Sequence, residues 1–237
     1  MDEPRSPDHG PAGAPDVRDE EFEARFVATA AIVVAAGLML VLPDRVATIP
    51  RWVIPVLAAV LGVVLLLGSL RWNDPSDPWH GRLRGVSLVL LAVMSLGNVT
   101  SGARLVVDLA RAQGIRDPAT LLLTGGAIWL TNVIVFSLWY WELDRGGPVK
   151  RSRTPWTADK RSCSFLFPQM YNTDYGKVGW RPEFVDYLYT SFTNATAFSP
   201  TDVMPLSRPA KLAMMLQSGL SIVILVLVVA RAVNILH

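Results

Sequence analysis

Long apolar runs, separated by short polar links, dominate the hydrophobic pattern of the chain. Phe26–Leu42 and Val53–Leu70 contain no charged residue, and neither does a third run at Leu212–Ala230. Two further runs, Val86–Leu109 and Ala119–Trp141, carry isolated polar side chains. With its flanking residues, each run is long enough to cross a hydrocarbon core of roughly 30 Å at about 1.5 Å per residue. The pattern predicts an all-α integral membrane protein with five transmembrane helices.

A shorter segment ahead of the last run has a different pattern. Pro182 suits the first position of a helix, and an apolar residue then recurs every four positions, at Phe184, Leu188 and Phe192. The helix predicted over Glu183–Thr193 is about 17 Å long, roughly half a bilayer. We therefore predict a re-entrant half-helix between the fourth and fifth spans. A helix lying on the membrane surface is the alternative.

Composition agrees with a membrane protein and narrows its chemistry. Apolar residues make up 51% of the 237, mean hydropathy is +0.34, and a net charge of +2 gives no reason to expect nucleic-acid binding. The single cysteine, Cys163, excludes an intramolecular disulfide and a cysteine-based zinc cluster. The histidines have no metal-ligand spacing, and no nucleophile–base pair or phosphate-binding motif is present in the sequence. We expect no catalytic residue, no metal and no cofactor, and a multi-pass protein of the plasma (inner) membrane.

The same pattern suggests how the chain is divided. Residues 1–25 are rich in Asp, Glu, Pro and Gly, and we expect a disordered acidic tail without a cleavable signal peptide. A peripheral three-helix bundle is predicted to follow, and then a pore-like unit. The predicted boundaries are 26–118 for the bundle and 119–237 for the pore-like unit, which comprises an outer helix, an extramembrane loop at 142–181, the half-helix and a filter-like loop at 182–205, and an inner helix at 212–236.

Several polar residues fall within or at the ends of the predicted spans. Arg104 and Asp108 are four residues apart, so they share a helix face and are predicted to form a buried polar pair. Such a pair serves either gating or proton relay, or packing near a helix end. Asn98 and Asn132 are predicted to form hydrogen bonds between helices. Glu142 and Asp144 are predicted to lie in the headgroup layer.

The segment "TSFTNATAFSPTDVMPLSRPAKLAMMLQSGLSIVILVL" resembles the pore helix, filter and inner helix of the potassium-channel superfamily. The resemblance covers Glu183 to Leu236. It places the filter run on Ala197, Phe198, Ser199, Pro200, Thr201 and Asp202, with Thr196 one residue before it. Asp202 and Pro205 match the family pattern directly, and Gly219 lies near the position of a hinge glycine. The whole chain also resembles an uncharacterised group of small bacterial membrane proteins, in which "WYWELDRGGP" and "TAFSPTDVMPL" are typical.

The filter-like loop departs from a potassium filter in one important respect. Ser199 and Thr201 replace the two glycines, and Pro200 fixes φ and lacks an N–H. A cage of backbone carbonyls is therefore not expected. A wider mouth lined by hydroxyls, with a ring of Asp202 carboxylates from several subunits, would pass cations with weak selectivity. A turn or cap that holds the loop is the alternative role of Asp202.

These observations predict a tetrameric ion channel-like protein that assembles from copies of itself in the lipid bilayer. Gln217, Gly219 and Ser221 form the polar and small cluster of the last helix, and they are predicted to line the pore or act as a hinge, with helix packing as the alternative for Gly219. Inorganic cations would be the permeating species. The alternatives are a non-conducting membrane scaffold that keeps a pore-domain shape, and a transporter or membrane enzyme.

Overall fold

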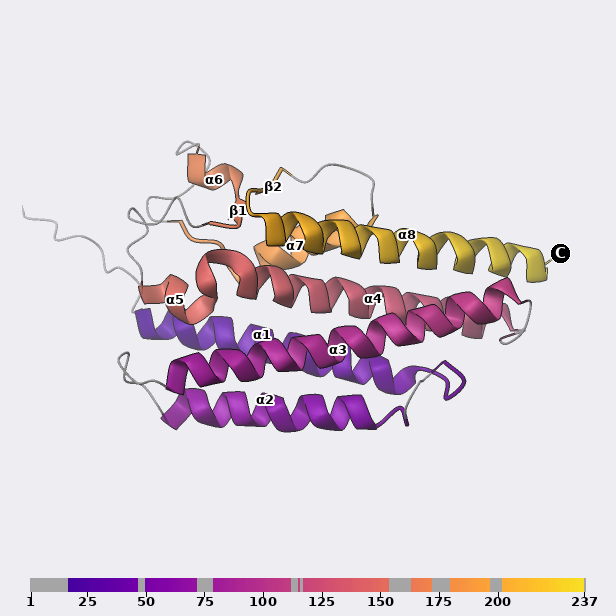
Figure 1. Cartoon of the computed structure of the whole chain (residues 1–237), viewed down its shortest axis with the longest axis horizontal. Helices are drawn as coiled ribbons and strands as arrows, with labels where there is room; N and C mark the ends of the chain where they lie inside the picture. The colour runs from indigo at the N-terminus through magenta and orange to yellow at the C-terminus, as the bar shows by residue number, and fades with distance from the viewer. Residues whose placement is uncertain are drawn as a thin grey trace, which may run out of the picture.

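The computed structural model is mostly helical and describes residues 17–46, 50–71, 79–111, 115, 117–153, 163–171, 180–196 and 202–236. Five long helices run along one axis, with a shorter helix lying beside two of them (Figure 1). The six are α1 Val17–Val41, α2 Val53–Arg71, α3 Trp79–Ala110, α4 Pro118–Leu143, α7 Phe184–Thr196 and α8 Arg208–Leu236.

Short elements gather at the end of the molecule where α4 finishes (Figure 1). They are the 3₁₀ turn η1 Asp144–Gly146, the helices α5 Pro148–Arg153 and α6 Pro168–Tyr171, and the strands β1 Phe165–Leu166 and β2 Met204–Pro205. The two strands pair antiparallel, with Phe165 opposite Pro205 and Leu166 opposite Met204. The predicted extramembrane loop at 142–181 therefore holds short ordered elements within its described part.

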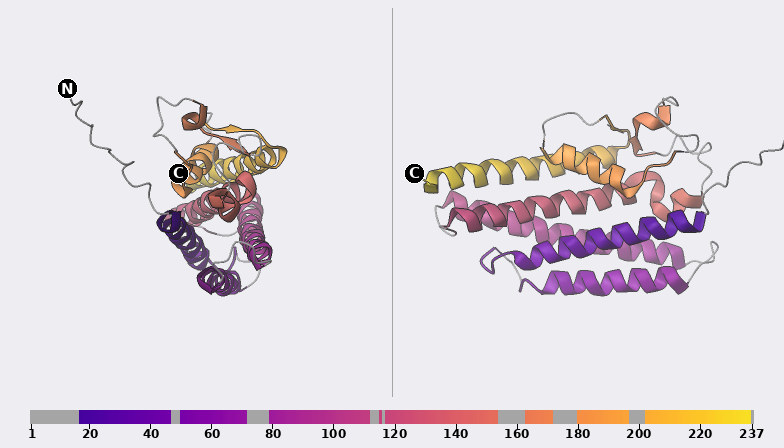
Figure 2. Two further views of the ribbon diagram at one scale, coloured as in Figure 1. Left: turned by 90° about the vertical axis from the view of Figure 1, so that its left-hand side faces the viewer. Right: turned by 180° about the vertical axis from the view of Figure 1, so that it is seen from behind.

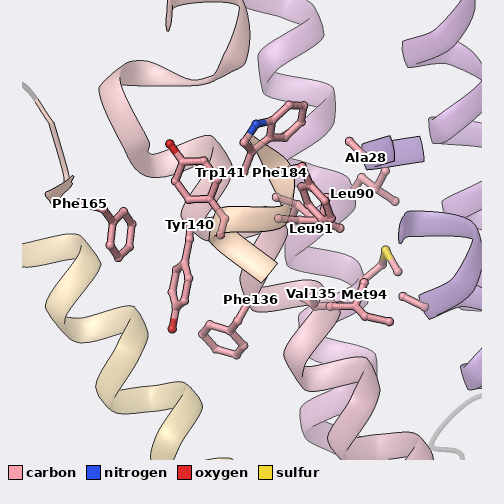
Figure 3. Close-up of a cluster of buried hydrophobic side chains, with 14 of the residues drawn as sticks. Ala28, Leu90, Leu91, Met94, Val135, Phe136, Tyr140, Trp141, Phe165 and Phe184 are labelled. Atoms are coloured by element: carbon pink, nitrogen blue, oxygen red, sulfur yellow. The ribbon is translucent and has the colours of Figure 1, made fainter. Parts of the chain in front are cut away.

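The helix α4 lies at the centre of the bundle. It packs against α1 and α3 on one side and against α7 and α8 on the other, whereas α2 packs on α1 and α3. The end-on view in Figure 2 shows this order, with α8 and α2 at opposite edges. Figure 3 shows the core around α4, where Tyr140 and Phe165 lie toward α8 and Leu90 and Ala28 lie toward the other helices.

Local chemistry sets both ends of α4. Asp117 precedes it, and the Oδ2 atom of Asp117 accepts hydrogen bonds from the N–H of Thr120 at 2.8 Å and from its hydroxyl at 2.5 Å. Pro118 follows at the first helical position, where proline is tolerated because the N–H that it lacks would have no partner within the helix. At the other end, three successive residues have positive φ: Arg145 at 51°, Gly146 at 80° and Gly147 at 95°. A helix cannot continue through that conformation.

Three helices are long and apolar enough to cross a membrane: Gly81–Ala110, Pro118–Gly146 and Arg208–Ile235. The apolar parts of the first two helices, Phe26–Val41 and Val53–Leu65, are shorter. The prediction of a mostly helical chain is therefore confirmed, and three of its helices have the length and composition of transmembrane spans.

The predicted helix boundaries need correction mainly at helix starts. The helix α1 begins at Val17 instead of Phe26, within the predicted acidic tail, because "VRDEEFEAR" combines good helix formers without Pro or Gly. The helices α3 and α8 also begin early, at Trp79 and Arg208, several residues before their apolar runs. Charged and polar helix formers extend a helix beyond its lipid-compatible part.

Candidate functional site

The half-helix α7 lies along α4 and α8. Near its start, the Tyr187 hydroxyl donates to Asp144 Oδ2 at 2.7 Å, at the C-terminal end of α4. One turn later, Ser191 Oγ donates to the carbonyl of Val133 at 2.6 Å. Val133 lies eleven residues before Asp144 in the sequence, about 16 Å along a helix. The helix α7 thus follows the second half of α4 and ends about halfway along it (Figure 1).

A buried polar cluster joins the end of α7 to the other two helices, and Gln217 of α8 is at its centre. The Gln217 side chain is fully buried. Its Nε2 atom donates to Ser191 Oγ at 2.7 Å and to the Ser191 carbonyl at 3.0 Å. Its Oε1 atom accepts from the hydroxyl of Tyr140 and from Asn194 Nδ2, the latter at 2.8 Å. One amide therefore connects α4, α7 and α8.

Asn194 and Asn132 extend this cluster in two directions. Asn194 Nδ2 also donates to the Met214 carbonyl at 3.0 Å, and Asn194 Oδ1 accepts from Ser218 Oγ at 3.0 Å. Asn132 Nδ2 donates to Ser221 Oγ at 2.9 Å, directly between α4 and α8. The interhelical hydrogen bond predicted for Asn132 is confirmed. At 4% exposure Asn98 is buried as well, but within the described residues its Oδ1 atom accepts no hydrogen bond.

A second polar cluster surrounds Asp144, just past the end of α4. The carboxylate Oδ1 accepts the backbone N–H of Ser164 at 2.7 Å and that of Phe165 at 3.3 Å. Its other oxygen accepts the Tyr187 hydroxyl, so one fully buried side chain fixes β1 and α7 together. Buried carboxylates are stable when such donors satisfy them. Protein encloses the Asp144 side chain, and the headgroup level predicted for it stays a prediction.

Arg151 of α5 closes the end of α4 from outside. Its Nη1 atom donates to the carbonyls of Trp141 and Asp144, both at 2.8 Å. Its guanidinium lies 5.3 Å from the ring centroid of Tyr187 and 5.7 Å from that of Trp141. A cation at this end complements the negative pole of the helix dipole and satisfies its last carbonyls.

The structure gives Gln217 and Ser221 a different role from the predicted one. Both are fully buried within one chain, between α8 and its neighbours, so they do not line a path between subunits. Gly219 lies on the opposite side of α8, exposed, and a Cβ atom there would meet nothing within 4 Å. The polar face of α8 holds α7 in place, and the face that it leaves outward is apolar.

The filter-like loop is described only at its two edges. Thr196 is the last residue of α7, and its hydroxyl donates to the Thr193 carbonyl at 2.9 Å. Asp202 is exposed at the start of the return toward β2. The predicted positions Ala197, Phe198, Ser199, Pro200 and Thr201 lie outside the described residues.

Arg104 and Asp108 lie together as predicted, but the other helices of the chain do not bury them. Arg104 is exposed and Asp108 is partly exposed. With Arg45 of the link after α1, they line a shallow hollow at the far end of the bundle from α5. Within the described part of the chain no other helix covers these two side chains, so the prediction that the pair is buried is wrong for a single chain.

Sequence reasoning did not identify most members of the polar clusters. Tyr140, Ser191 and Asn194 are not among the site residues that the sequence predicts. The sequence does contain a usable signal, because Thr190, Ser191 and Asn194 put polar groups on one face of the half-helix. Polar side chains at membrane depth are expected to hydrogen-bond to another helix.

No family model, curated protein or solved structure matches the chain. The resemblance of its C-terminal part to potassium channels therefore stays a prediction. Among the described residues, no three His, Cys, Asp or Glu side chains gather as a metal site would require.

Proposed function

We propose that the protein is a multi-pass protein of the plasma (inner) membrane that conducts cations passively as a homotetramer. Five helices, α1, α2, α3, α4 and α8, would span the bilayer, and α7 would enter it and turn back. The observation that carries the proposal is the placement of α7 along the second half of α4, fixed by Tyr187–Asp144 and Ser191–Val133. A surface helix would cross the spans instead of running beside them.

The path would form where the segment after α7 meets its copies in other subunits. The C-terminal end of α7 carries a partial negative charge, and it would point toward mid-membrane, where it favours a cation. Asp202 is exposed, so four copies could form an acidic ring that concentrates cations without strong selection between them. Because Gln217 and Ser221 face their own subunit, the proposed lining no longer includes them.

The release of cations from liposomes tests this function directly. Vesicles that contain the wild-type protein should release K⁺ and Na⁺ at similar rates. Asp202→Ala should slow that release by about tenfold, because the focusing charge is lost. Asp44→Ala is the matched control, since it removes an exposed carboxylate whose contact with Arg51 is a surface pair. Equal flux for wild type and Asp202→Ala would contradict the proposed acidic ring.

A non-conducting scaffold is the second candidate, and one observation favours it. The polar groups of α8 are used inside the subunit, so its outward face, including Met215, Ile222 and Val226, is apolar. Mass measurement of the purified protein separates the two functions together with the flux assay. A monomer, or a tetramer in tight vesicles with no flux, would leave the scaffold as the function.

A further inference from the structure

The turn after α4 brings two cationic side chains to one point. Arg145, Gly146 and Gly147 all have positive φ, and the turn passes close to the start of α3. An ideal Cβ atom on Gly146 would lie 3.7 Å from Lys150 Nζ and 3.8 Å from Arg84 Nη1. The ammonium group of α5 and the guanidinium group of α3 are therefore both within 4 Å of one position beside the glycine backbone.

Glu142 fixes the orientation of Arg84. The Arg84 Nε atom lies 3.8 Å from Glu142 Oε2, while Ser87 Oγ donates to the other carboxylate oxygen at 2.6 Å. The Glu142 side chain is only 8% exposed, and that of Arg84 is 46% exposed. Arg84 thus contacts the buried acid through Nε, and its Nη1 atom extends toward Gly146 and Lys150.

The glycines are needed for this arrangement. A Cβ atom on Gly147 would stand 2.8 Å from Glu142 Oε2, and one on Gly146 would stand 2.8 Å from Lys150 Cδ. Both contacts are shorter than a carbon atom normally allows. The two neighbouring arginines of this turn have other roles, since Arg151 caps α4 and Arg145 Nη2 points to Met170 Sδ at 3.7 Å.

This point lies where two candidate spans end together. Arg84 lies in the first turn of the apolar helix Gly81–Ala110, and Gly146 is the last residue of the apolar helix Pro118–Gly146. These two helix ends lie at the same end of the bundle (Figure 1). Lys150 is exposed there. In a membrane this level corresponds to the headgroups, where basic groups between helices bind anionic lipids.

We propose that Arg84 and Lys150, with the Gly146–Gly147 turn between them, bind the phosphate of an anionic phospholipid headgroup. A phosphate oxygen accepts hydrogen bonds from a guanidinium and an ammonium at once. Glu142 offsets only part of the two positive charges and holds Arg84 in position for the lipid. The site uses no residue of α7, α8 or the segment between them, so its test does not depend on ion conduction.

Lipid binding to the full chain in an uncharged detergent tests the site. Phosphatidylglycerol and phosphatidylcholine would be titrated separately, and bound lipids counted by native mass spectrometry. Wild type should prefer phosphatidylglycerol, and Lys150→Gln should weaken its binding about fivefold. Lys211→Gln is the matched control, since this exposed lysine lies at the same end on α8 and should leave binding unchanged. Arg84→Lys keeps the charge and should retain most of the binding.

Each remaining outcome decides against the site. Unchanged phosphatidylglycerol binding by Lys150→Gln would overturn it, and that variant alters only an exposed side chain. An equal loss in Lys211→Gln would show a diffuse charge effect without a defined site. Inorganic phosphate that competes at the same concentration as the lipid would show that the ligand is free phosphate, and would overturn the assignment to a headgroup.

Discussion

The two sides of the bundle differ in the polar groups that they bury. Among α1, α2 and α3 the buried residues include small apolar side chains such as Ala28, Ala35 and Ala58. Close approach is possible there because residues such as Gly97 of α3 lack a side chain against Ile54. Toward α7 and α8, Gln217 and its partners form hydrogen bonds across three helices.

This difference indicates on which side of the bundle the helices are held in one fixed arrangement. In lipid, apolar helices gain little from burying apolar surface, and packing alone tolerates small shifts of one helix on another. A satisfied hydrogen-bond cluster tolerates few alternatives, because each displaced group would be left unpaired. The polar side of the bundle therefore specifies where α7 sits.

The largest expected effect follows from Gln217→Leu. The substitution keeps the volume but leaves Tyr140, Ser191 and Asn194 without their partner. We expect the free energy of unfolding in detergent to fall by about 3 kcal/mol, because several buried donors and acceptors lose their hydrogen bonds. Thermal or denaturant unfolding measures this. Gly219→Ala, two residues away and in open space, is the control and should change stability by less than about 0.5 kcal/mol.

Gly97→Ala is the corresponding change on the apolar side. The new Cβ would lie 2.3 Å from Ile54 Cδ1, so α2 and α3 must separate or Ile54 must change rotamer. A loss of about 2 kcal/mol is expected from this overpacking.

A second substitution checks the cause of that loss. Ile54→Ala combined with Gly97→Ala should restore part of the stability, because the clashing atom is removed. Gly62→Ala on α2 has nothing within 4 Å and serves as the control. If the double variant is no more stable than Gly97→Ala, the close contact is not the reason for the loss.

A smaller effect is expected from Tyr187→Phe. The ring stays in place, but Asp144 Oδ2 loses its hydroxyl donor. Because the acceptor is a buried carboxylate, unfolding stability should fall by about 1.5 kcal/mol. Tyr189→Phe two residues later changes an exposed side chain, 56% accessible, and should have no measurable effect. Equal stabilities for the two variants would show that the hydrogen bond from Tyr187 to Asp144 does not contribute to stability.

The smallest expected effect is a pH dependence at the start of α4. The hydrogen bonds from the Thr120 hydroxyl and N–H lower the pKa of Asp117. A lowered pKa in the folded state means that this cap stabilises the helix at neutral pH and is lost as pH falls through that lowered pKa. Melting temperatures of wild type and Asp117→Asn, compared between about pH 7 and about pH 3, should converge at the acidic end. A constant difference would exclude titration of Asp117 as the cause.

The sequence predicts the helices well and their contacts poorly, for a physical reason. Apolar length locates α2 and α4 to within a few residues, and the four-residue period locates α7. The rotation of α8 about its own axis cannot be predicted in this way, because apolar residues occur on every face of that helix. Nothing in that pattern indicates that Gln217 turns toward its own subunit. Hydrogen-bond partners such as Asn132 and Ser221, 89 positions apart, depend on that rotation.

The charged end of α4 shows the same limit. Glu142 and Asp144 follow an aromatic stretch, which predicts a headgroup position but gives no sign of the short elements that bury them. The ladder of Phe165 and Leu166 with Met204 and Pro205 is too short to recognise in a sequence. These elements become visible only when distant segments meet.

That small ladder also affects how the protein can change over evolution. The ladder pairs β1, which precedes α7 in the chain, with β2, which lies just before α8. The stretch between the two strands, which includes α7, therefore starts and ends at the same place in the fold. Residues can be added to or removed from such a closed loop, because the entropic cost of closing a loop grows only slowly with its length. The helices α4 and α8 on either side would keep their register while the stretch that contains α7 is remodelled.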